Sequence, residues 1–533
     1  MQGTGGCATA HTVTLTGVSG HVIDVQADVS QGLVSTTLVG RPDASVSEAR
    51  DRCRTAIVNS HYDWPATRRV TILLSPADLP KRGPHLDLAI ALAVLAASGV
   101  VNPATLVGRV VLGELTLDGR LRAVPGVLPM VLAARNRGLT QVMVPEVHVD
   151  EAQMVPGVSV IGVRSLKQAV TLLRGDPVPD APPVEPLSGG HLLSWRGDRR
   201  AVDLDLADVH GMGDARYALE VAAAGGHHLM LSGPKGAGKT TLAERLPSLL
   251  PDLSVEETLE LSAVHSLSGD LPPHAVSGVR PPFRAPHHSA TKASVLGGGS
   301  GRVHPGEISR ALHGVLFLDE FPLFSSDIIE SLRQPLEHGE VTIARGDEVA
   351  TFPARTMVVL ASNPCPCGDY HPDVRESRCV CSEVRRRSYR EKISGPVTDR
   401  VDITRHIAPL KPYELHDPLA RPETTAEVRV RVEAARSRQA ERYAGTAWRV
   451  NADVPGPELT ARWPLTDDGQ RLLDEHLCSG RVTRRGAARA HRLAWTVADL
   501  RGEDIPGRDC VEIAVRLRAG DPLPVAALPV TAR

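Results

Sequence analysis

Eight consecutive residues have the spacing G-x-x-x-x-G-K-[ST] of a phosphate-binding loop: Gly233, Pro234, Lys235, Gly236, Ala237, Gly238, Lys239 and Thr240. Glycines in such a loop let backbone N–H groups turn toward phosphate oxygens, and a helix that follows presents its positive end to them. The pattern assigns Lys239 to the β- and γ-phosphates of a nucleotide and Thr240 to a Mg²⁺ ion. A glycine turn with an unrelated lysine is the alternative interpretation.

A second segment, about eighty residues further along, decides between these interpretations. Four apolar residues at 315–318 precede Asp319 and Glu320, as in a buried parallel strand whose carboxyl end opens at the ligand edge of a sheet. We expect Asp319 to hold Mg²⁺, directly or through water, and Glu320 to orient and deprotonate the water that attacks the γ-phosphate. Because both halves of a nucleotide site rarely occur together by chance, we interpret the two segments as one site.

Short regular elements must position these side chains. Apolar runs at 229–231 and 357–361 predict two further strands, and the pattern at 242–246 predicts a helix directly after the loop. Much earlier, β-rich runs such as 70–74 alternate with helical runs such as 86–97. This alternation indicates an α/β domain separate from the one that holds the nucleotide motifs.

Composition and charge limit the class of protein. The 533 residues include 60 Lys and Arg against 62 Asp and Glu, and only 3% are aromatic. The chain has no global positive field and too few aromatic rings for an extended platform on which single-stranded bases stack, so any DNA contact must be local. No apolar run approaches the ~20 residues that span a bilayer, and the first ten residues lack a signal sequence. We therefore expect a cytoplasmic protein with no membrane partner.

A resemblance to a known family begins at residues 80–88, Pro-Lys-Arg-Gly-Pro-His-Leu-Asp-Leu, which an Ala- and Leu-rich helix follows. This segment resembles part of the Lon-protease-like domain that begins the YifB/ComM family of magnesium-chelatase-like AAA+ ATPases. Proteolytic relatives place the serine of a Ser-Lys dyad after a Gly-Pro pair, where this chain has His85. Their lysine would fall near 127–131, where no lysine occurs. Without a nucleophile no acyl-enzyme forms, so the resemblance implies an inactive Lon-like domain.

The resemblance also implies roles for three residues beyond the nucleotide motifs. Asn363 takes the place of a sensor that hydrogen-bonds the γ-phosphate or its attacking water, with a turn asparagine as the alternative. Arg400 lies in a segment, 394–402, that resembles the family's arginine finger, which reaches the nucleotide of a neighbouring subunit. Arg489 takes the place of a second sensor aimed at nucleotide, with a solvated basic face as the alternative.

Four of the eight cysteines cluster as two C-x-C pairs: Cys365, Cys367, Cys379 and Cys381. Four thiols suffice for a tetrahedral Zn²⁺ site, whose closed coordination would make the metal structural. The C-x-C spacing is tighter than the usual C-x-x-C knuckle, and four unpaired thiols are the alternative.

These observations predict a multidomain α/β protein with an inactive Lon-protease-like α/β domain, a P-loop AAA+ α/β core and a C-terminal helical lid. The predicted boundaries are 1–175 for the Lon-like domain, 176–200 for a Pro-rich linker, 201–412 for the core with a candidate zinc-binding insertion at 363–382, 413–520 for the lid and 521–533 for a frayed tail.

The resemblance implies Mg²⁺-dependent ATP hydrolysis by a homo-oligomeric ring, with a hexamer as the expected assembly. Analogy within the family makes DNA the expected substrate, through helicase or branch-migration activity on recombination intermediates. Two alternatives stay open: a motor that remodels proteins, and a metal-chelatase-type motor subunit. Stimulation of ATP hydrolysis by DNA separates the first function from the other two.

Overall fold

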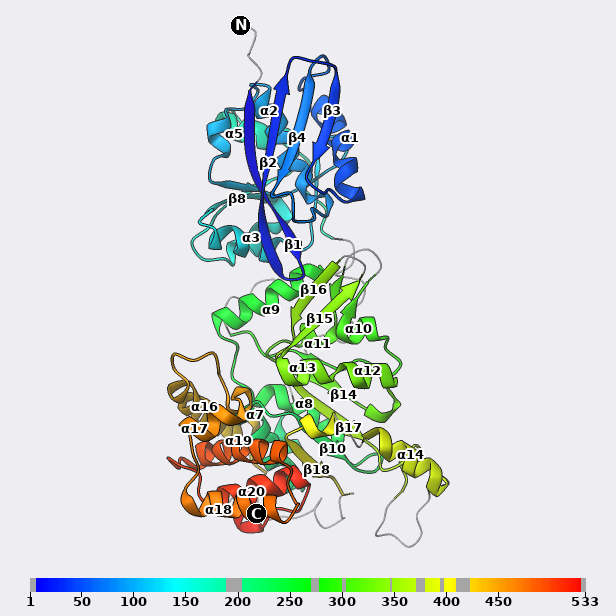
Figure 1. The fold of residues 1–533 in the computed structure, drawn as a ribbon, viewed down its shortest axis with the longest axis vertical. Coiled ribbons are helices and arrows are strands. Elements are labelled where there is room, and N and C mark those ends of the chain that lie inside the picture. The colour runs from blue at the N-terminus through cyan, green and yellow to red at the C-terminus, as the bar shows by residue number, and fades with distance from the viewer. Residues whose placement is uncertain are drawn as a thin grey trace. The chain divides into compact units, whose positions relative to one another are not determined.

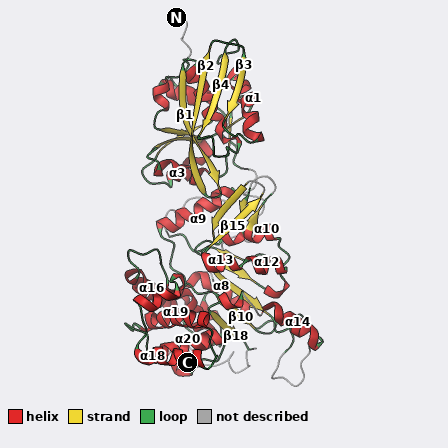
Figure 2. Cartoon of the chain, viewed as in Figure 1, coloured by secondary structure: helices red, strands yellow, loops and turns green. Residues whose placement is uncertain are grey.

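The computed structural model describes residues 6–187, 204–269, 278–299, 303–345, 348–370, 379–393, 397–408 and 422–528. They form two compact units, drawn as ribbons in Figures 1 and 2. The N-terminal unit comprises residues up to 193 together with 255–276 and 342–352, and the C-terminal unit comprises 194–254, 277–341 and 353–533. The N-terminal unit therefore includes two stretches that we expected in the AAA+ core.

A seven-stranded mixed sheet lies at the centre of the N-terminal unit, in the order β3-β4-β2-β1-β5-β8-β9. β1 pairs antiparallel with β2 and parallel with β5, and a separate two-stranded ladder joins β6 to β7. The strands are β1 (Cys7–Thr16), β2 (Ser19–Ser30), β3 (Ser35–Val39), β4 (Arg69–Ser75), β5 (Arg109–Val111), β6 (Glu114–Leu115), β7 (Leu121–Arg122), β8 (Gln141–Pro145) and β9 (Ser159–Val163). β4 confirms the strand predicted at 70–74.

Five helices between Ala44 and Arg174 accompany this sheet: α1 (Ala44–Asn59), α2 (Asp87–Ala97), α3 (Val127–Asn136), α4 (Val149–Gln153) and α5 (Leu166–Arg174). Every residue of α2 is buried. A helix that is apolar on all sides has no face to offer to water, so it must lie inside the core. α2 confirms the helix predicted at 86–97.

The residues at the expected protease positions are packed into the N-terminal unit. His85, in the short 3-10 helix η1 (Pro84–Leu86), is buried, and its Nε2 lies 2.7 Å from the backbone oxygen of Val13 as a hydrogen-bond donor. Residues 127–131, where the lysine of proteolytic relatives would fall, form the buried apolar start of α3. This arrangement agrees with the absence of a Ser-Lys dyad.

Two segments from much later in the sequence complete the N-terminal unit. Helix α9 (Val255–Ser268) packs against α3, where the N–H of Gly126 donates to the oxygen of Ser266 at 3.0 Å. The hairpin of β15 (Glu340–Arg345) and β16 (Glu348–Pro353) approaches the β1–β2 turn so closely that a Cβ on Gly17 would lie 2.7 Å from the oxygen of Thr351. The unit is therefore built from three stretches of chain.

A five-stranded, fully parallel sheet lies at the centre of the C-terminal unit, in the order β11-β14-β17-β10-β18. Its strands are β10 (Leu229–Ser232), β11 (Phe283–Arg284), β14 (Val315–Leu318), β17 (Met357–Ser362) and β18 (Ile403–His406), and a separate short ladder joins β12 (Gly297–Gly298) to β13 (His304–Pro305). β10, β14 and β17 confirm the strands predicted around the nucleotide motifs. Because the strands are parallel, their carboxyl ends lie at one edge of the sheet.

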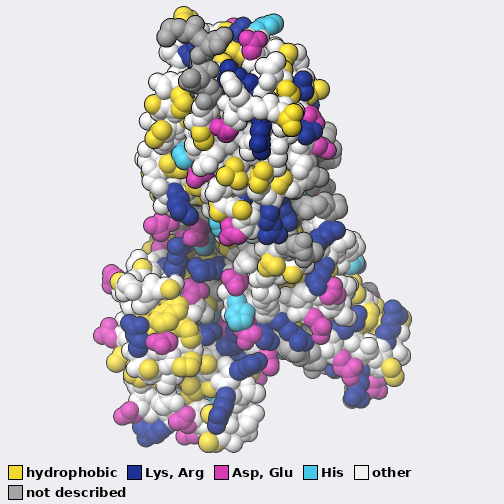
Figure 3. All heavy atoms as spheres, turned by 45° about the horizontal axis from the view of Figure 1, so that its top comes forward, with side chains coloured by type: hydrophobic (Ala, Val, Ile, Leu, Met, Phe, Trp, Pro, Cys, Tyr) yellow, Lys and Arg dark blue, Asp and Glu magenta, His cyan; other side chains and the backbone are white. Residues whose placement is uncertain are grey.

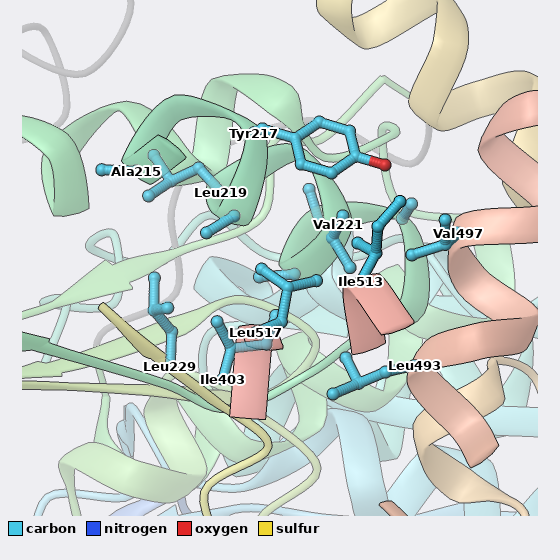
Figure 4. Packing of buried hydrophobic residues seen from close by; sticks show 14 of the residues in the cluster. Ala215, Tyr217, Leu219, Val221, Leu229, Ile403, Leu493, Val497, Ile513 and Leu517 are labelled. Atoms are coloured by element: carbon cyan, nitrogen blue, oxygen red, sulfur yellow. The ribbon is translucent and has the colours of Figure 1, made fainter. Parts of the chain in front are cut away.

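Helices of the C-terminal unit that belong to the sheet region are α7 (Gly213–Gly225), α8 (Lys239–Leu249), α10 (Lys292–Leu296), α11 (Glu307–Arg310), α12 (Ser326–Ser331), α13 (Arg333–His338) and α14 (Glu383–Ile393). Residues 422–528 contain only helices and loops, with α16 (Thr425–Arg442), α17 (Gly456–Arg462), α18 (Asp467–Cys478), α19 (Arg484–Arg501) and α20 (Arg508–Ala519). Figure 4 shows how this helical part joins the sheet: side chains of α19 and α20 meet those of α7, β10 and β18 in one buried cluster.

The expected linker and tail have different outcomes. Residues 176–187 form no helix or strand, and 188–200 lie outside the described residues. The prediction of a frayed tail is wrong for 521–528, because Leu523 and Leu528 are buried and the N–H of Leu523 donates to Asp214 at 2.8 Å. Residues 529–533 lie outside the described part. Among the described residues, no helix has the length and apolar character needed to cross a membrane.

Candidate nucleotide-binding site

The loop between β10 and α8 has the backbone that close approach to phosphate requires. Gly236 and Gly238 have φ angles of 79° and 87°, which residues with a Cβ rarely adopt. A Cβ on Gly233 would lie 2.4 Å from the backbone oxygen of Ile407, so glycine alone fits there. The loop is completed by Pro234, Lys235 and Ala237. Because α8 begins at Lys239, its free N–H groups and positive end face the loop.

The ammonium group of Lys239 lies at the centre of this loop. It donates to the backbone oxygens of Gly233 and Pro234 at 2.7 and 2.9 Å and to Oδ1 of Asn363 at 2.9 Å. Burial lowers the pKa of Lys239, while the carboxylates of Asp319 and Glu320 act in the opposite direction. The partly desolvated ammonium group of Lys239 is thus bound by three uncharged oxygens, which the phosphate oxygens of a nucleotide can replace.

Thr240 and Asp319 meet at the same edge of the sheet. The Thr240 hydroxyl donates to Oδ2 of Asp319 at 3.2 Å, and Asp319 directly follows β14. Hydroxyl and carboxylate oxygens are the hard ligands that Mg²⁺ prefers, and the ion commonly keeps waters and substrate phosphates in its remaining positions. The donor set therefore fits the predicted Mg²⁺ site.

Glu320 has a backbone conformation that is unusual for its type. Its φ and ψ of 49° and 42° are left-handed, and it begins the short helix η5 (Phe321–Leu323). Such a conformation costs about 1–3 kcal/mol and persists where the surrounding structure fixes it, as at active sites. Its Oε2 lies 3.6 Å from Nδ1 of His288. Sequence reasoning gave His288 no catalytic role, because the only signal was a pair of adjacent histidines far from Glu320.

Asn363 lies immediately after β17, between the loop and the acidic strand end. Its hydrogen bond with Lys239 brings the amide directly to the phosphate-binding loop, as its predicted sensor role requires. Tyr389 of α14 is buried, and its phenol lies beside the backbone of Asn363. Burial raises the pKa of Tyr389 to about 12. Nothing in the spacing of Tyr389 pointed to this contact.

Arg400 lies at the opposite edge of the sheet. It ends the helix η6 (Thr398–Arg400), just before β18, whose direction parallels β10. A strand of four residues separates that edge from the phosphate loop by about 13 Å. The guanidinium donates to Oε2 of Glu337, by Nε at 3.2 Å, and this contact lowers the pKa of Glu337. The structure does not bring Arg400 to the phosphate loop of its own chain.

Arg489 also lies at the amino edge. It pairs with Asp402, a buried residue just before β18 that also accepts from the N–H of His228 at 3.2 Å. Burial opposes ionisation of Asp402, but Arg489 and the neighbouring histidines together hold its pKa well below the usual range. This ion pair ties α19 to the sheet. Action of Arg489 at a nucleotide stays a prediction, and within its own chain the residue is directed elsewhere.

The four clustered cysteines come together beside Asn363. The Sγ atoms of Cys365 and Cys367 lie 3.2 Å apart, and each lies 3.6 Å from Sγ of Cys379. With Cys381 included, the four ligand atoms all lie within 4.8 Å of one another. A tetrahedral zinc with sulfur ligands at about 2.3 Å has sulfur atoms about 3.8 Å apart, so the cluster fits such an ion. Residues 371–378 of the predicted insertion lie outside the described residues.

A phosphate loop, an acidic strand end and a polar residue on the strand between them meet at the carboxyl edge of a five-stranded parallel sheet, and a helical segment follows. This combination defines an ATPase of the AAA+ type. The comparisons with known proteins agree: the family described as magnesium chelatase, subunit ChlI, matches residues 205–415, a second ChlI description matches 25–148, and the ChlI C-terminal description matches 422–518.

Similar proteins extend over almost the whole chain. An uncharacterized protein of Mycobacterium tuberculosis is 44% identical over 96% of this chain and 98% of its own length. YifB of Escherichia coli is 38% identical over 96% of this chain and 97% of its own. The competence protein ComM of Haemophilus influenzae is 37% identical over 91% and 92%. The chain belongs to the YifB/ComM family of magnesium-chelatase-like proteins.

Proposed function

We propose that this chain hydrolyses ATP with Mg²⁺ as one subunit of a ring-shaped motor. The observation that carries the proposal is the gathering of five residues at one sheet edge: Lys239, Thr240, Asp319, Glu320 and Asn363. Lys239 binds the β- and γ-phosphates, and Thr240 and Asp319 would hold Mg²⁺, which would neutralise charge on the phosphates. Glu320 accepts the proton of the attacking water, and Asn363 orients that water or the γ-phosphate.

The placement of Arg400 supports a ring of identical subunits. An arginine at the amino edge of the sheet cannot stabilise charge on a γ-phosphate at the carboxyl edge of the same sheet. A second copy that presents its amino edge to the first copy's phosphate loop completes the site. A hexamer is the assembly that we propose, as expected for the family.

We propose DNA as the substrate of the ring, through helicase or branch-migration activity on recombination intermediates. The support is analogy with a relative named as a competence protein. In a closed ring, each basic side chain also occurs once in every subunit, which concentrates positive charge for DNA. Remodelling of protein complexes and a chelatase-type role are the functions that remain if DNA is not the substrate.

The test of this function is steady-state ATP hydrolysis by the purified chain, alone and with single-stranded, duplex, forked and four-way-junction DNA at several salt concentrations. We expect DNA to raise the rate several-fold, and the increase to fall as salt rises, because phosphate contacts release counterions. Hydrolysis that no DNA changes, at any salt concentration, contradicts the DNA function and leaves the ATPase proposal intact.

We also propose that the cysteine cluster binds one structural Zn²⁺. The support is the fit of the four sulfur atoms to tetrahedral coordination and their position between the end of β17 and the start of α14. A closed site with four protein ligands leaves no position for substrate. Its role would be to fix the two segments that meet at Asn363.

Metal analysis of the purified chain is expected to find about one zinc per chain. Replacing both Cys367 and Cys381 with serine is expected to abolish this content and to lower the melting temperature, because binding energy at a structural zinc site is folding energy. The exposed cysteine Cys478 provides the matched control, since its replacement with serine should change neither quantity. Absence of zinc from the wild-type chain, with all four thiols of the cluster free to react in addition to the exposed Cys7 and Cys478, would refute the proposal.

A further inference from the structure

Helix α14 (Glu383–Ile393) has a charge balance unlike that of the rest of the chain. It carries five basic side chains against two acidic ones, whereas the whole sequence is close to neutral. Over the face drawn in Figure 3, dark-blue basic side chains lie among magenta acidic ones. A helix with this excess of positive charge is a local attraction for a polyanion.

The basic side chains of α14 are open to solvent on most of the helix. Arg385, Arg390 and Lys392 are exposed and have no ion-pair partner among the described residues. Arg385 and Lys392 are seven residues apart, so they lie on the same side of the helix two turns apart. In Figure 1, α14 stands at the edge of the C-terminal unit away from helices α16 to α20. These side chains are therefore free to contact a ligand.

Helix α14 also contacts the nucleotide site. Tyr389 is only 6% exposed, and its phenol lies beside the backbone of Asn363. The helix also packs against η5, the turn that begins directly after the left-handed Glu320. One short helix thus joins an exposed basic surface to two residues proposed to act on the attacking water.

The cysteine cluster brings the start of this helix close to the segment that follows β17 and carries Asn363. Cys379 and Cys381 immediately precede α14, and Cys365 and Cys367 immediately follow Asn363. If the four cysteines bind the proposed zinc ion, the start of α14 is tied to the segment that contains Cys365 and Cys367, and the two move together. A displacement of α14 must then reach the segment that carries Asn363.

We propose that α14 is a DNA-contacting element that couples substrate to hydrolysis: its exposed basic side chains bind the phosphate backbone of DNA, and Tyr389 transmits the contact to Asn363. This inference rests on the proposed DNA motor and names the surface that the motor uses. Asn363 holds the ammonium group of Lys239 in the described arrangement. Movement of Asn363 when DNA binds α14 frees its amide for the γ-phosphate or the attacking water.

The first test replaces Arg385 and Arg390 with alanine and measures DNA affinity against salt concentration. Removing one phosphate interaction should reduce the steepness of log K against log salt by about one, and we expect at least a ten-fold weaker affinity at low salt. The ratio of ATP hydrolysis rates with and without DNA should fall toward one. The matched control, with Arg471 and Arg508 replaced by alanine, removes two exposed arginines from the helical lid and should leave both quantities at their wild-type values.

The second test separates contact from transmission. Tyr389→Phe keeps the buried ring and removes the hydroxyl that lies beside the backbone of Asn363. We expect DNA affinity to stay within about two-fold of wild type while the DNA-dependent increase in kcat falls several-fold. A merely structural tyrosine would lower the rates with and without DNA together.

The outcomes distinguish this inference from the proposed function. Wild-type affinity and stimulation in the Arg385/Arg390 variant overturn the contact surface while leaving the DNA motor standing. Full stimulation in Tyr389→Phe overturns the transmission step. A wild-type chain that binds no DNA and is not stimulated by it overturns the proposed DNA function itself, and the α14 surface falls with it.

Discussion

Replacing Glu320 with glutamine is expected to lower kcat for ATP hydrolysis by about 10²–10⁴-fold, the usual contribution of a general base. Glutamine has nearly the same shape but cannot accept the proton of the attacking water. The binding contacts of Lys239, Thr240 and Asp319 stay in place, so affinity for ATP should change little. ATP binding and single-turnover hydrolysis by the same preparation measure the two effects separately.

A matched control is available on the neighbouring helix α12. Glu330 is an exposed carboxylate that forms a long ion pair with Arg333, so Glu330→Gln should leave hydrolysis within about two-fold of wild type. If Glu320→Gln loses less than about five-fold in kcat, the general-base assignment is wrong. Loss of ATP binding instead of turnover would assign Glu320 a role in holding the nucleotide.

Replacing Arg400 with alanine should lower kcat by about 10³–10⁵-fold, the contribution measured for arginine fingers supplied to a γ-phosphate. The variant should fold normally, since its partner Glu337 is 42% exposed and can be hydrated when the guanidinium is removed. Arg400→Lys keeps the charge but loses the planar fork, so it should recover only a small part of the rate. Circular dichroism and the oligomeric state in ATP check that the loss is catalytic.

Mixing two inactive variants tests whether Arg400 acts on a neighbouring subunit. Lys239→Ala lacks ATP binding but still offers Arg400, and Arg400→Ala binds ATP but lacks the finger. A finger that acts between subunits predicts that equal, randomly mixed rings recover about a quarter of the wild-type rate. Mixed rings as inactive as either variant alone would show that Arg400 does not complete a neighbour's site.

The nucleotide motifs could be predicted from sequence because their information is local. The loop 233–240 depends on glycines at fixed spacing, and Asp319 follows four consecutive apolar residues, which form the buried strand β14. The contacts of His288 and Tyr389 could not be predicted, since each depends on residues that meet it only after the chain has folded. The tail failed for a related reason: its Pro- and Ala-rich composition hides two leucines that find a buried place.

The ion pairs at the amino edge of the parallel sheet could not be predicted from the sequence either. Arg400 and Arg489 could be compared with family patterns, yet their partners Glu337 and Asp402 had no signal in spacing or composition. Ion pairs between distant segments depend on strand order, and strand order is a property of the whole sheet. The parallel pairing of β18 with β10 places Arg400, and the Asp402 that binds Arg489, at the end of the sheet opposite the loop 233–240.

The construction of the N-terminal unit from three stretches affects how the chain folds during its synthesis. Helix α9 and the β15–β16 hairpin belong to this unit, but the last of its residues, near 352, is made long after Arg174. At translation rates of about 5–20 residues per second, the ribosome needs on the order of 10–40 s to supply the missing pieces. Helix α9 is complete about 5–20 s after Arg174, and the apolar side chains of α3 that it covers stay exposed until then. For the same reason, cutting the gene at codon 175 would separate the N-terminal sheet from α9 and the β15–β16 hairpin.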